Sequence, residues 1–439
     1  MKTNRTGCTF ALICLLVVTS VQGQDLIEVY ELALANDSKI REAQQRLESV
    51  RETKPQARAL LLPSLSLSGD VNANRRDVRE SVGATGLDSF GNYGLSINLL
   101  QPIYHRDYWI QLEQADSVIA QAEAEYAAAQ LDLMARIVEA YFGVLAADDN
   151  LTVSEAQTKA NQRQLEQAKQ RFDVGLIAIT DVHEAQAAFD GARANQIAAE
   201  NEVDSAWEAL FEIIGHQPEG KLAKLGEKLP LSRPTPEDMA EWADTAMQQN
   251  YAVVAARNAA EAQKQTIEIQ RSGHFPTLDL VGGYGVDRTR QDFGTDVDTG
   301  VIGLQLNVPL YQGGAVSSRT RQAQYDYEAA RESLDQQRRA VNRQVRDAYR
   351  GVISSISRVN ALKATVVSSR SALESTQAGY DVGTRTLVDV LTVQSSMFDS
   401  TRNYLASRYN YIINGLLLKQ AASTLTRQDL ERVNAWLVD

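Results

Sequence analysis

The residue types that most often carry catalysis or hold a metal are few in this sequence, and their spacing fits neither role. None of the four histidines has another histidine or a cysteine at metal-ligand spacing. They are His105, His183, His216 and His274. Gly283 and Gly285 begin a dinucleotide-binding pattern, but Arg288 occupies the place of its third glycine, and no Gly-x-Ser-x-Gly nucleophile motif is present. We therefore predict no enzyme activity, no cofactor and no metal site.

Two polar segments that match each other could instead make hydrogen bonds and ion pairs. Phe-Asp-Val-Gly at 172–175, followed by Asp-Val at 181–182, recurs as Tyr-Asp-Val-Gly at 380–383, followed by Asp-Val at 389–390. Glycine favours the left-handed conformation in which helices end, and an acid suits the first turn of the next helix. Each segment therefore predicts a helix, a tight turn and a second helix, with hydrogen bonds and ion pairs available at the turn.

These segments belong to a longer internal repeat with a period of about 208 residues. Pro-Ile-Tyr at 102–104 recurs as Pro-Leu-Tyr at 309–311, and Pro-Ser-Leu-Ser-Leu at 63–67 recurs as Pro-Thr-Leu-Asp-Leu at 276–280. Because several short sequence segments recur at nearly the same offset, we predict that the chain arose by duplication.

The domain organisation follows from this repeat. Residues 1–23 have the basic start, apolar run and small-residue end of a secretory signal peptide, and both cysteines lie within them. The first repeat is predicted at 24–230 and the second at 231–439, with the best linker candidate at 216–236, which holds four of the nine prolines. The net charge of −12 makes nucleic acid an improbable partner.

Each repeat contains two stretches in which apolar and polar residues alternate, as in half-buried strands. Leu65 and Leu67, for example, alternate with Ser64 and Ser66. The four predicted strands are about 63–72, 93–102, 276–287 and 300–310. The segments between paired strands are polar and contain glycine, which predicts exposed loops. Alternation alone is equally typical of a soluble antiparallel sheet with one face in water.

Long helices occupy most of the rest of each repeat. Apolar and small residues recur at steps of three and four, as in a coiled coil, so each repeat is predicted to contain a long helical hairpin. The hairpins lie at about 105–214 and 315–421. A further helix of about 35 residues is predicted before each strand pair, from Leu26 to Leu60 and from about 237 to 271, the second interrupted near Asn250.

Four alternating strands of this length match outer-membrane barrel strands but cannot close a barrel. Open strand edges are not tolerated in hydrocarbon, so other copies of the chain are predicted to complete the sheet. The predicted fold class is mainly α, with long coiled-coil-like helical hairpins, plus four strands per chain that contribute to a membrane β-barrel.

The segments 171–182, 379–390 and 309–314 carry the most specific resemblance, which extends over nearly all of the mature chain. The chain resembles the TolC family of outer-membrane channel proteins. The resemblance implies a homotrimer in the outer membrane of a Gram-negative bacterium, with one shared 12-stranded barrel in the lipid. Below it, the helices would form a long periplasmic tunnel, an α-barrel with a mixed α/β belt around its middle.

The resemblance also implies function and partners. The tunnel tip would meet a periplasmic adaptor (membrane fusion) protein bound to an inner-membrane efflux pump or ABC exporter. The chain would then be the passive exit duct of tripartite efflux and type I secretion systems. The alternative is a secreted coiled-coil structural or adhesion protein without a pore. The sequence names no cargo.

Family members keep the periplasmic end shut with polar links between neighbouring hairpins. By position, this aperture latch falls on Thr180 and Asp181 in the first hairpin and on Tyr380 and Arg385 in the second. An alternative from the residues themselves is that Thr180 is a helix N-cap and Asp181 a first-turn acid that complements the helix dipole. The two roles can coexist.

Two further sites follow from the resemblance. Asp389 would contribute to an acidic ring at the constriction, although it also suits the first turn of a helix. The family's best-known member has a second acid one turn further on, where this chain has Thr392, so a weaker constriction is expected. The tip motifs that adaptors grip in this family match Val174, Gly175, Leu176, Val382, Gly383 and Thr384.

Overall fold

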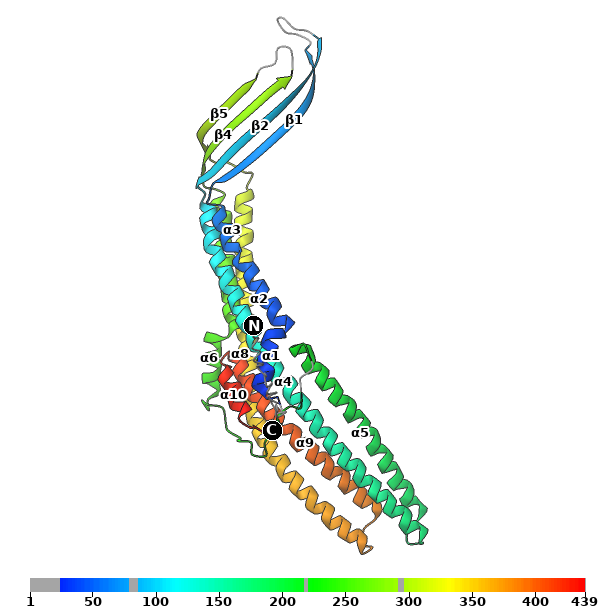
Figure 1. The fold of residues 1–439 in the computed structure, drawn as a ribbon. Helices are drawn as coiled ribbons and strands as arrows, with labels where there is room; N and C mark the ends of the chain where they lie inside the picture. The colour runs from blue at the N-terminus through cyan, green and yellow to red at the C-terminus, as the bar shows by residue number, and fades with distance from the viewer. Residues whose placement is uncertain (1–23, 79–85, 217–219, 291–295, 439) are drawn as a thin grey trace, which may run out of the picture.

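The computed structural model describes residues 24–78, 86–216, 220–290 and 296–438, so the predicted signal peptide lies outside the described residues. The molecule is strongly elongated (Figure 1). A four-stranded sheet lies at one end, long helices run away from it, and two helical hairpins end in separate tips at the other end. Among the described helices, none combines the length and the hydrophobicity that a membrane crossing requires.

The sheet is antiparallel, with the order β1-β2-β4-β5. Its strands are β1 (Ser64–Val78), β2 (Gly86–Tyr104), β4 (Thr277–Arg290) and β5 (Val297–Asn307). Each repeat therefore contributes one hairpin, and β2 of the first hairpin pairs with β4 of the second. This leaves β1 and β5 as the two edges, which have no further strand among the described residues.

The first hairpin is longer than the alternation predicts. Its backbone ladder runs in unbroken register from the Ser64–Leu100 pair to the Val78–Gly86 pair. Most of the segment that was predicted as a polar loop is therefore paired strand. Polar residues mislead here because an exposed strand end needs no apolar side chains to keep its backbone hydrogen bonds.

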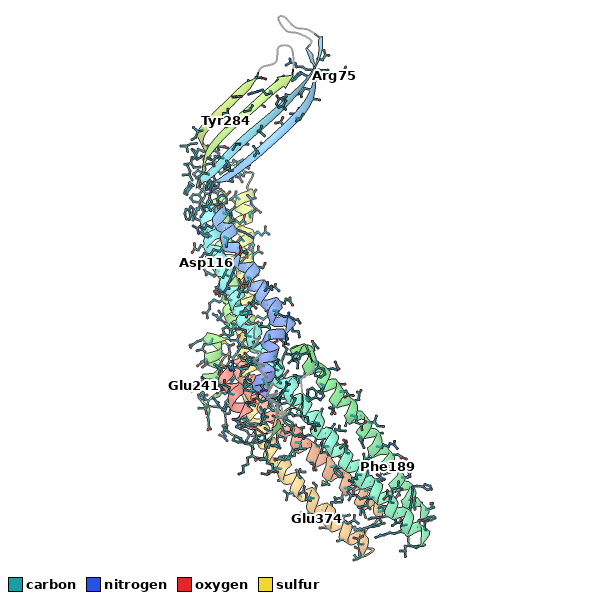
Figure 2. All side chains as sticks on the ribbon, in the orientation of Figure 1. Arg75, Asp116, Phe189, Glu241, Tyr284 and Glu374 are labelled. Atoms are coloured by element: carbon teal, nitrogen blue, oxygen red, sulfur yellow. The ribbon has the colours of Figure 1, made fainter. Side chains whose placement is uncertain are left out.

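One face of the sheet is apolar and exposed. Leu65, Val71 and Ile302 are exposed by 71%, 86% and 79%, and Tyr284 of β4 is a further large exposed side chain, labelled in Figure 2. The other face carries small polar groups such as Ser68 and Ser96, whose hydroxyls are 2.8 Å apart. A continuous apolar face of this kind indicates contact with lipid or another protein.

Four helices form the two long hairpins. In the first, α4 (Arg106–Asp173) is followed by α5 (Ile179–Ile214); in the second, α8 (Ala315–Asp381) is followed by α9 (Leu387–Ala421). Before α8, Gly313 and Gly314 both have positive φ, which makes the strand-to-helix corner tight.

Shorter helices flank the halves of α4 and α8 nearer the sheet. The helix predicted from Leu26 to Leu60 is instead three helices, because Asp37 and Glu52 interrupt it. They are α1 (Leu26–Asn36), α2 (Ser38–Arg51) and α3 (Thr53–Ala59). In the second repeat, α6 (Met239–Gln249) and α7 (Tyr251–Ser272) are separated at Asn250, as predicted, where the amide side chain caps α7.

The main apolar core lies at mid-length, where the hairpins meet the flanking helices. Tyr141 and Phe142 of α4 are fully buried and stack edge to face, and Phe142 also contacts the ring of Tyr409 on α9. A belt of short elements surrounds this core: the linker 220–238, α6, α10 (Arg427–Asn434), and a small sheet of β3 (Lys224–Leu225) with β6 (Leu437–Val438).

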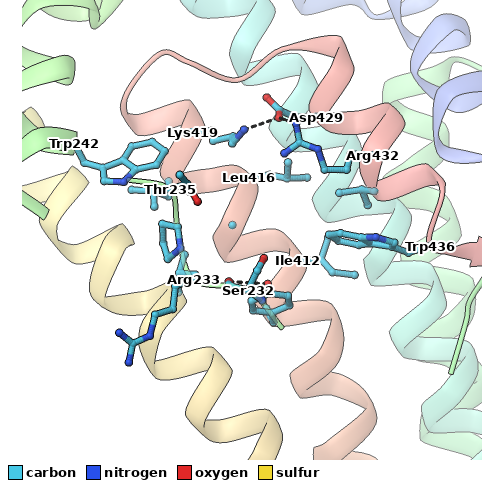
Figure 3. A pocket seen from close by; sticks show the side chains of 16 residues that line it. Ser232, Arg233, Thr235, Trp242, Ile412, Leu416, Lys419, Asp429, Arg432 and Trp436 are labelled. Atoms are coloured by element: carbon cyan, nitrogen blue, oxygen red, sulfur yellow. Dashed lines mark hydrogen bonds and ion pairs between the residues drawn. The ribbon is translucent and has the colours of Figure 1, made fainter. Parts of the chain in front are cut away.

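A cavity of about 200 Å³ lies in the belt (Figure 3). Trp242, Leu416 and Trp436 form part of its wall. The ion pair between Lys419 and Asp429, 2.5 Å from nitrogen to oxygen, borders it. The linker, α9 and α10 all contribute residues to the wall of the cavity. None of the site residues predicted from the sequence is among them.

A buried ion pair fixes the bend between α1 and α2 against α4. Asp37 is 2% exposed, caps α2 through the Ile40 amide, and accepts hydrogen bonds from Arg136 at 2.9 and 3.2 Å. Burial raises the pKa of the Asp37 carboxyl, but the bonds from Arg136 and Ile40 outweigh burial and hold this pKa below its usual value. The charged form of Asp37 is therefore stabilised by folding.

We predict that Asp37→Asn, which can still cap α2, lowers the free energy of unfolding at pH 7 by about 2 kcal/mol. A carboxyl whose pKa is lowered by folding stabilises above the unfolded pKa of about 3.9 and ceases to do so as the pH falls through its folded pKa. The difference between wild type and variant should thus begin to shrink near pH 4 and vanish only below the folded pKa of Asp37. Guanidinium chloride unfolding followed by circular dichroism across pH measures it. A difference independent of pH would contradict this account.

Candidate functional site

The two hairpin tips are built alike. Gly175 and Gly383 have φ angles of 77° and 80°, the left-handed conformation that ends a helix. The Leu176 amide donates to the Arg171 carbonyl at 2.8 Å, and the Thr384 amide donates to the Gly379 carbonyl at 2.8 Å. The glycine of the recurring Asp-Val-Gly segment is thus required by the turn itself.

Apolar side chains project from both turns into solvent. Val174 and Leu176 are exposed by 70% and 73%, and Val382 by 75%. Thr384 differs, because its hydroxyl donates to the Gly379 carbonyl at 3.0 Å and so stabilises the turn. Exposed apolar groups at the extreme end of an elongated molecule form a surface suited to a protein partner.

The first pair of predicted latch residues lies in the first turn of α5. The N-cap of α5 is Ala178, without a side-chain cap bond, so the N-cap role considered for Thr180 is wrong: Thr180 is the second residue of the helix. Alanine can precede the helix because the turn before it already fixes the backbone direction. Asp181 does have the first-turn position that complements the helix dipole.

The second pair lies in and after the last turn of α8. Tyr380 packs against a small apolar cluster that also receives Val182 of α5. Within the described part of one chain, neither Asp181 nor Arg385 makes an ion pair, and no hydrogen bond joins Thr180 or Asp181 to Tyr380 or Arg385. A single chain therefore leaves these groups available for contacts elsewhere.

Within one chain the two tips are joined by this small apolar cluster and also by Arg171, which the sequence did not single out. The Arg171 guanidinium lies 4.7 Å from the centre of the Tyr380 ring, and its Nη2 is 3.4 Å from Asp381 Oδ1. One signal was present in the sequence: Arg171 is matched in the second repeat by Gly379. A Cβ at Gly379 would lie 2.8 Å from Arg385 Cγ, so the glycine leaves room for the Arg385 side chain.

Asp389 forms a capping box with Thr386 at the start of α9. The Asp389 amide donates to Thr386 Oγ1 at 3.2 Å, and the Thr386 amide donates to Asp389 Oδ2 at 3.0 Å. The bonds from the Thr386 backbone and hydroxyl lower the pKa of the Asp389 carboxyl, with a smaller contribution from the charge of Arg385. In one chain, Asp389 is therefore ionised at neutral pH and fixed in position.

We predict that Arg171→Ser loosens the tip of α8, because it removes a cation–π contact and a partly exposed ion pair worth about 1 kcal/mol together. Amide hydrogen exchange at 379–385, read by mass spectrometry, should rise about fivefold. Lys169→Ser is the matched control, since Lys169 makes no ion pair among the described residues. Equal exchange in the two variants would contradict the assigned role of Arg171.

The chain matches the family model described as "Outer membrane efflux protein" over residues 29–216 and 242–424. It is 40% identical to the outer membrane protein TolC of Vibrio cholerae, with 95% of each chain covered. It is 27% identical to the proteases secretion protein PrtF of Dickeya chrysanthemi, with 95% of this chain and 92% of PrtF covered.

The fold is also that of a known structure. The crystal structure of the outer membrane protein VceC from Vibrio cholerae matches with a TM-score of 0.77 at 21% identity, covering 90% of this chain and 95% of VceC.

Proposed function

The chain belongs to the outer membrane efflux protein family, and we propose that it works as a trimeric channel-tunnel whose periplasmic end is opened by partner proteins. It is located in the outer membrane and is an exit duct of efflux and type I secretion systems. Its fold combines long helical hairpins of an α-barrel with strands of a β-barrel. The comparisons give no support to a secreted coiled-coil protein without a pore.

The observation that carries the channel proposal is the open sheet. Its apolar face suits lipid, its other face is polar, and its edge strands β1 and β5 have unpaired backbone groups. In hydrocarbon each such group costs several kcal/mol. Pairing β5 of one copy with β1 of the next removes both edges, and channels of this family are trimeric, so three copies give a barrel of twelve strands.

The partners follow from the tips. Channels of this family work with adaptor and pump components. The adaptor-docking surface is assigned to Val174, Gly175, Leu176, Val382, Gly383 and Thr384, whose exposed apolar members support a protein contact. Through the adaptor, the duct would reach an inner-membrane efflux pump or ABC exporter, and the cargo would pass through without a chemical step.

The latch is assigned to contacts between hairpins of neighbouring chains. Thr180 and Asp181 would meet Tyr380 and Arg385, and the absence of such links within the described part of one chain supports this assignment. An arginine–carboxylate pair and a tyrosine hydroxyl supply a few kcal/mol at most. A link of this strength holds the tips together and still yields to a binding partner.

We predict that Tyr380→Phe with Arg385→Ser raises the mean conductance of the purified protein in planar bilayers about tenfold, because the closed state loses about 1.4 kcal/mol of stabilisation. Wild type should form urea-resistant trimers with a low conductance. Tyr327→Phe with Arg370→Ser, on α8 and away from the tip, is the matched control. A soluble, non-conducting wild type would refute the channel, and unchanged conductance in the tip variant would refute the latch.

The acidic ring is assigned to Asp389. Three copies of a carboxylate around one axis attract cations, and their mutual repulsion opposes the pKa lowering that Thr386 provides in each chain. Thr392 supplies no second charge one turn further on. The ring would therefore select cations with a single layer of charge.

We expect Asp389→Ala to weaken block of the conductance by divalent cations about tenfold, measured as the concentration that halves the current. Glu374→Ala removes an exposed acid of α8 that lies outside the ring and is labelled in Figure 2, and it should leave block unchanged. If the same cation concentration halves the current in the Asp389 variant and in wild type, the acidic-ring hypothesis is refuted.

A further inference from the structure

The two hairpins of one chain are held together by two separate apolar clusters. The upper cluster is the main core, which on α4 extends down to Leu145 and on α9 begins at Tyr409. The tip cluster consists of Leu165 and Ala168 of α4 with Ala185 of α5 and Leu387 of α9. The interface between α4 and α9, called the seam below, is therefore apolar at both ends and has no apolar cluster of described residues in between.

Between the clusters, α4 turns mainly polar groups towards α9. Asn161 is 6% exposed and Gln394 is 5% exposed. The Gln394 amide donates to Asn161 Oδ1 at 2.6 Å, and the Asn161 amide donates to the Ala188 carbonyl of α5 at 2.8 Å. One amide side chain therefore ties α4 to α5 and α9 simultaneously.

One turn further from the tip, a second polar contact is less well satisfied. Arg402 of α9 donates to Gln157 Oε1 at 3.4 Å, and Gln157 is 8% exposed. The Arg402 Nε atom is buried and has no hydrogen-bond partner among the described residues. An unpaired buried donor costs about 1–3 kcal/mol, so the seam is weaker here than in the clusters on either side.

The packing is also open beside Arg402, on the side nearer the upper cluster. A groove of about 560 Å³ lies between α4, α5 and α9, and Arg402 is part of its wall. Gly191 lies within the continuous helix α5, close to Ala188, and a Cβ there would have no atom within 4 Å, so close packing does not require this glycine. A glycine inside a helix costs about 1 kcal/mol relative to alanine and makes the helix easier to bend.

We propose that the polar seam formed by Gln157, Asn161, Gln394 and Arg402 is the pivot about which the two hairpins of one chain move apart when the tips open. Apolar clusters are close-packed and rearrange as units, whereas amide and guanidinium groups can exchange their partners for water. The tip cluster can then move relative to the upper cluster while both stay packed. This proposal rests on the proposed gating of the duct. The four residues would act by setting the position of one hairpin relative to the other.

The test replaces the buried amides by apolar side chains of similar size. Asn161→Leu with Gln394→Leu should join the two clusters into one continuous apolar seam. Added to the latch variant Tyr380→Phe with Arg385→Ser, it should lower the mean planar-bilayer conductance about tenfold, back towards the wild-type value. The matched control is Ser355→Ala with Asn414→Leu, a polar pair inside the second hairpin, which should leave the conductance of the latch variant unchanged.

The outcomes separate the pivot from the gating. A latch variant that conducts equally well with and without the leucine pair, in trimers that resist urea, overturns the pivot alone. A latch variant that does not conduct overturns the gating and the pivot together. If the leucine pair prevents assembly, Asn161→Ala with Gln394→Ala in the wild-type background decides: a severalfold rise in open probability supports the pivot, and an unchanged open probability overturns it.

Discussion

The unpaired edges of the four-stranded sheet set the requirements for the rest of this molecule. Water could satisfy the backbone groups of β1 and β5, but lipid cannot, and the exposed apolar face of the sheet suits lipid. Only further copies of the chain can supply the missing strands. A shared barrel in turn places the first residues of α4 and α8 on a ring, so the long helices below it must form a tube.

Stability within one chain is divided between two kinds of contact. At mid-length, aromatic packing around Tyr141 and Phe142 and the buried pair of Asp37 with Arg136 fix the helices against one another. Below this core the hairpins meet at the polar contact of Asn161 with Gln394, and then at the small apolar tip cluster and the cation–π contact of Arg171. This arrangement suits a molecule whose upper part must stay assembled while its lower end opens.

Much of the fold could be predicted from the sequence because the chain repeats itself. The strand pairs and the helical hairpins follow from alternation, heptad spacing and the recurring Asp-Val-Gly segments. The breaks at Asp37 and Glu52 could not be predicted. Aspartate occurs in the first turn of helices as well as at their N-caps, and the break at Asp37 is fixed by its contact with Arg136, which is far along the chain. The prediction of a polar loop up to Asn92 was wrong for a related reason. Whether such a segment is a strand depends on its pairing with a second segment, which the composition of one segment does not show.

The candidate site was predicted less completely. The positions of Gly175, Gly383 and Asp389 follow from local turn and helix-start chemistry, which the sequence displays directly. Arg171, Asn161 and Gln394 act across hairpins that are more than 200 residues apart in sequence, so no local pattern reveals them. Arg171 alone of these departs visibly from the repeat pattern at the tip, since Gly379 is the matching residue, whereas Gln394 matches an identical residue, Gln186, and so gives no signal.

The claim on which the whole account depends is that several chains complete one barrel. Native mass spectrometry of the protein extracted from outer membranes in detergent tests it most directly. The account predicts a single species with the mass of three mature chains, which persists when the detergent is exchanged. A stable monomer or dimer would contradict it, because neither supplies twelve strands.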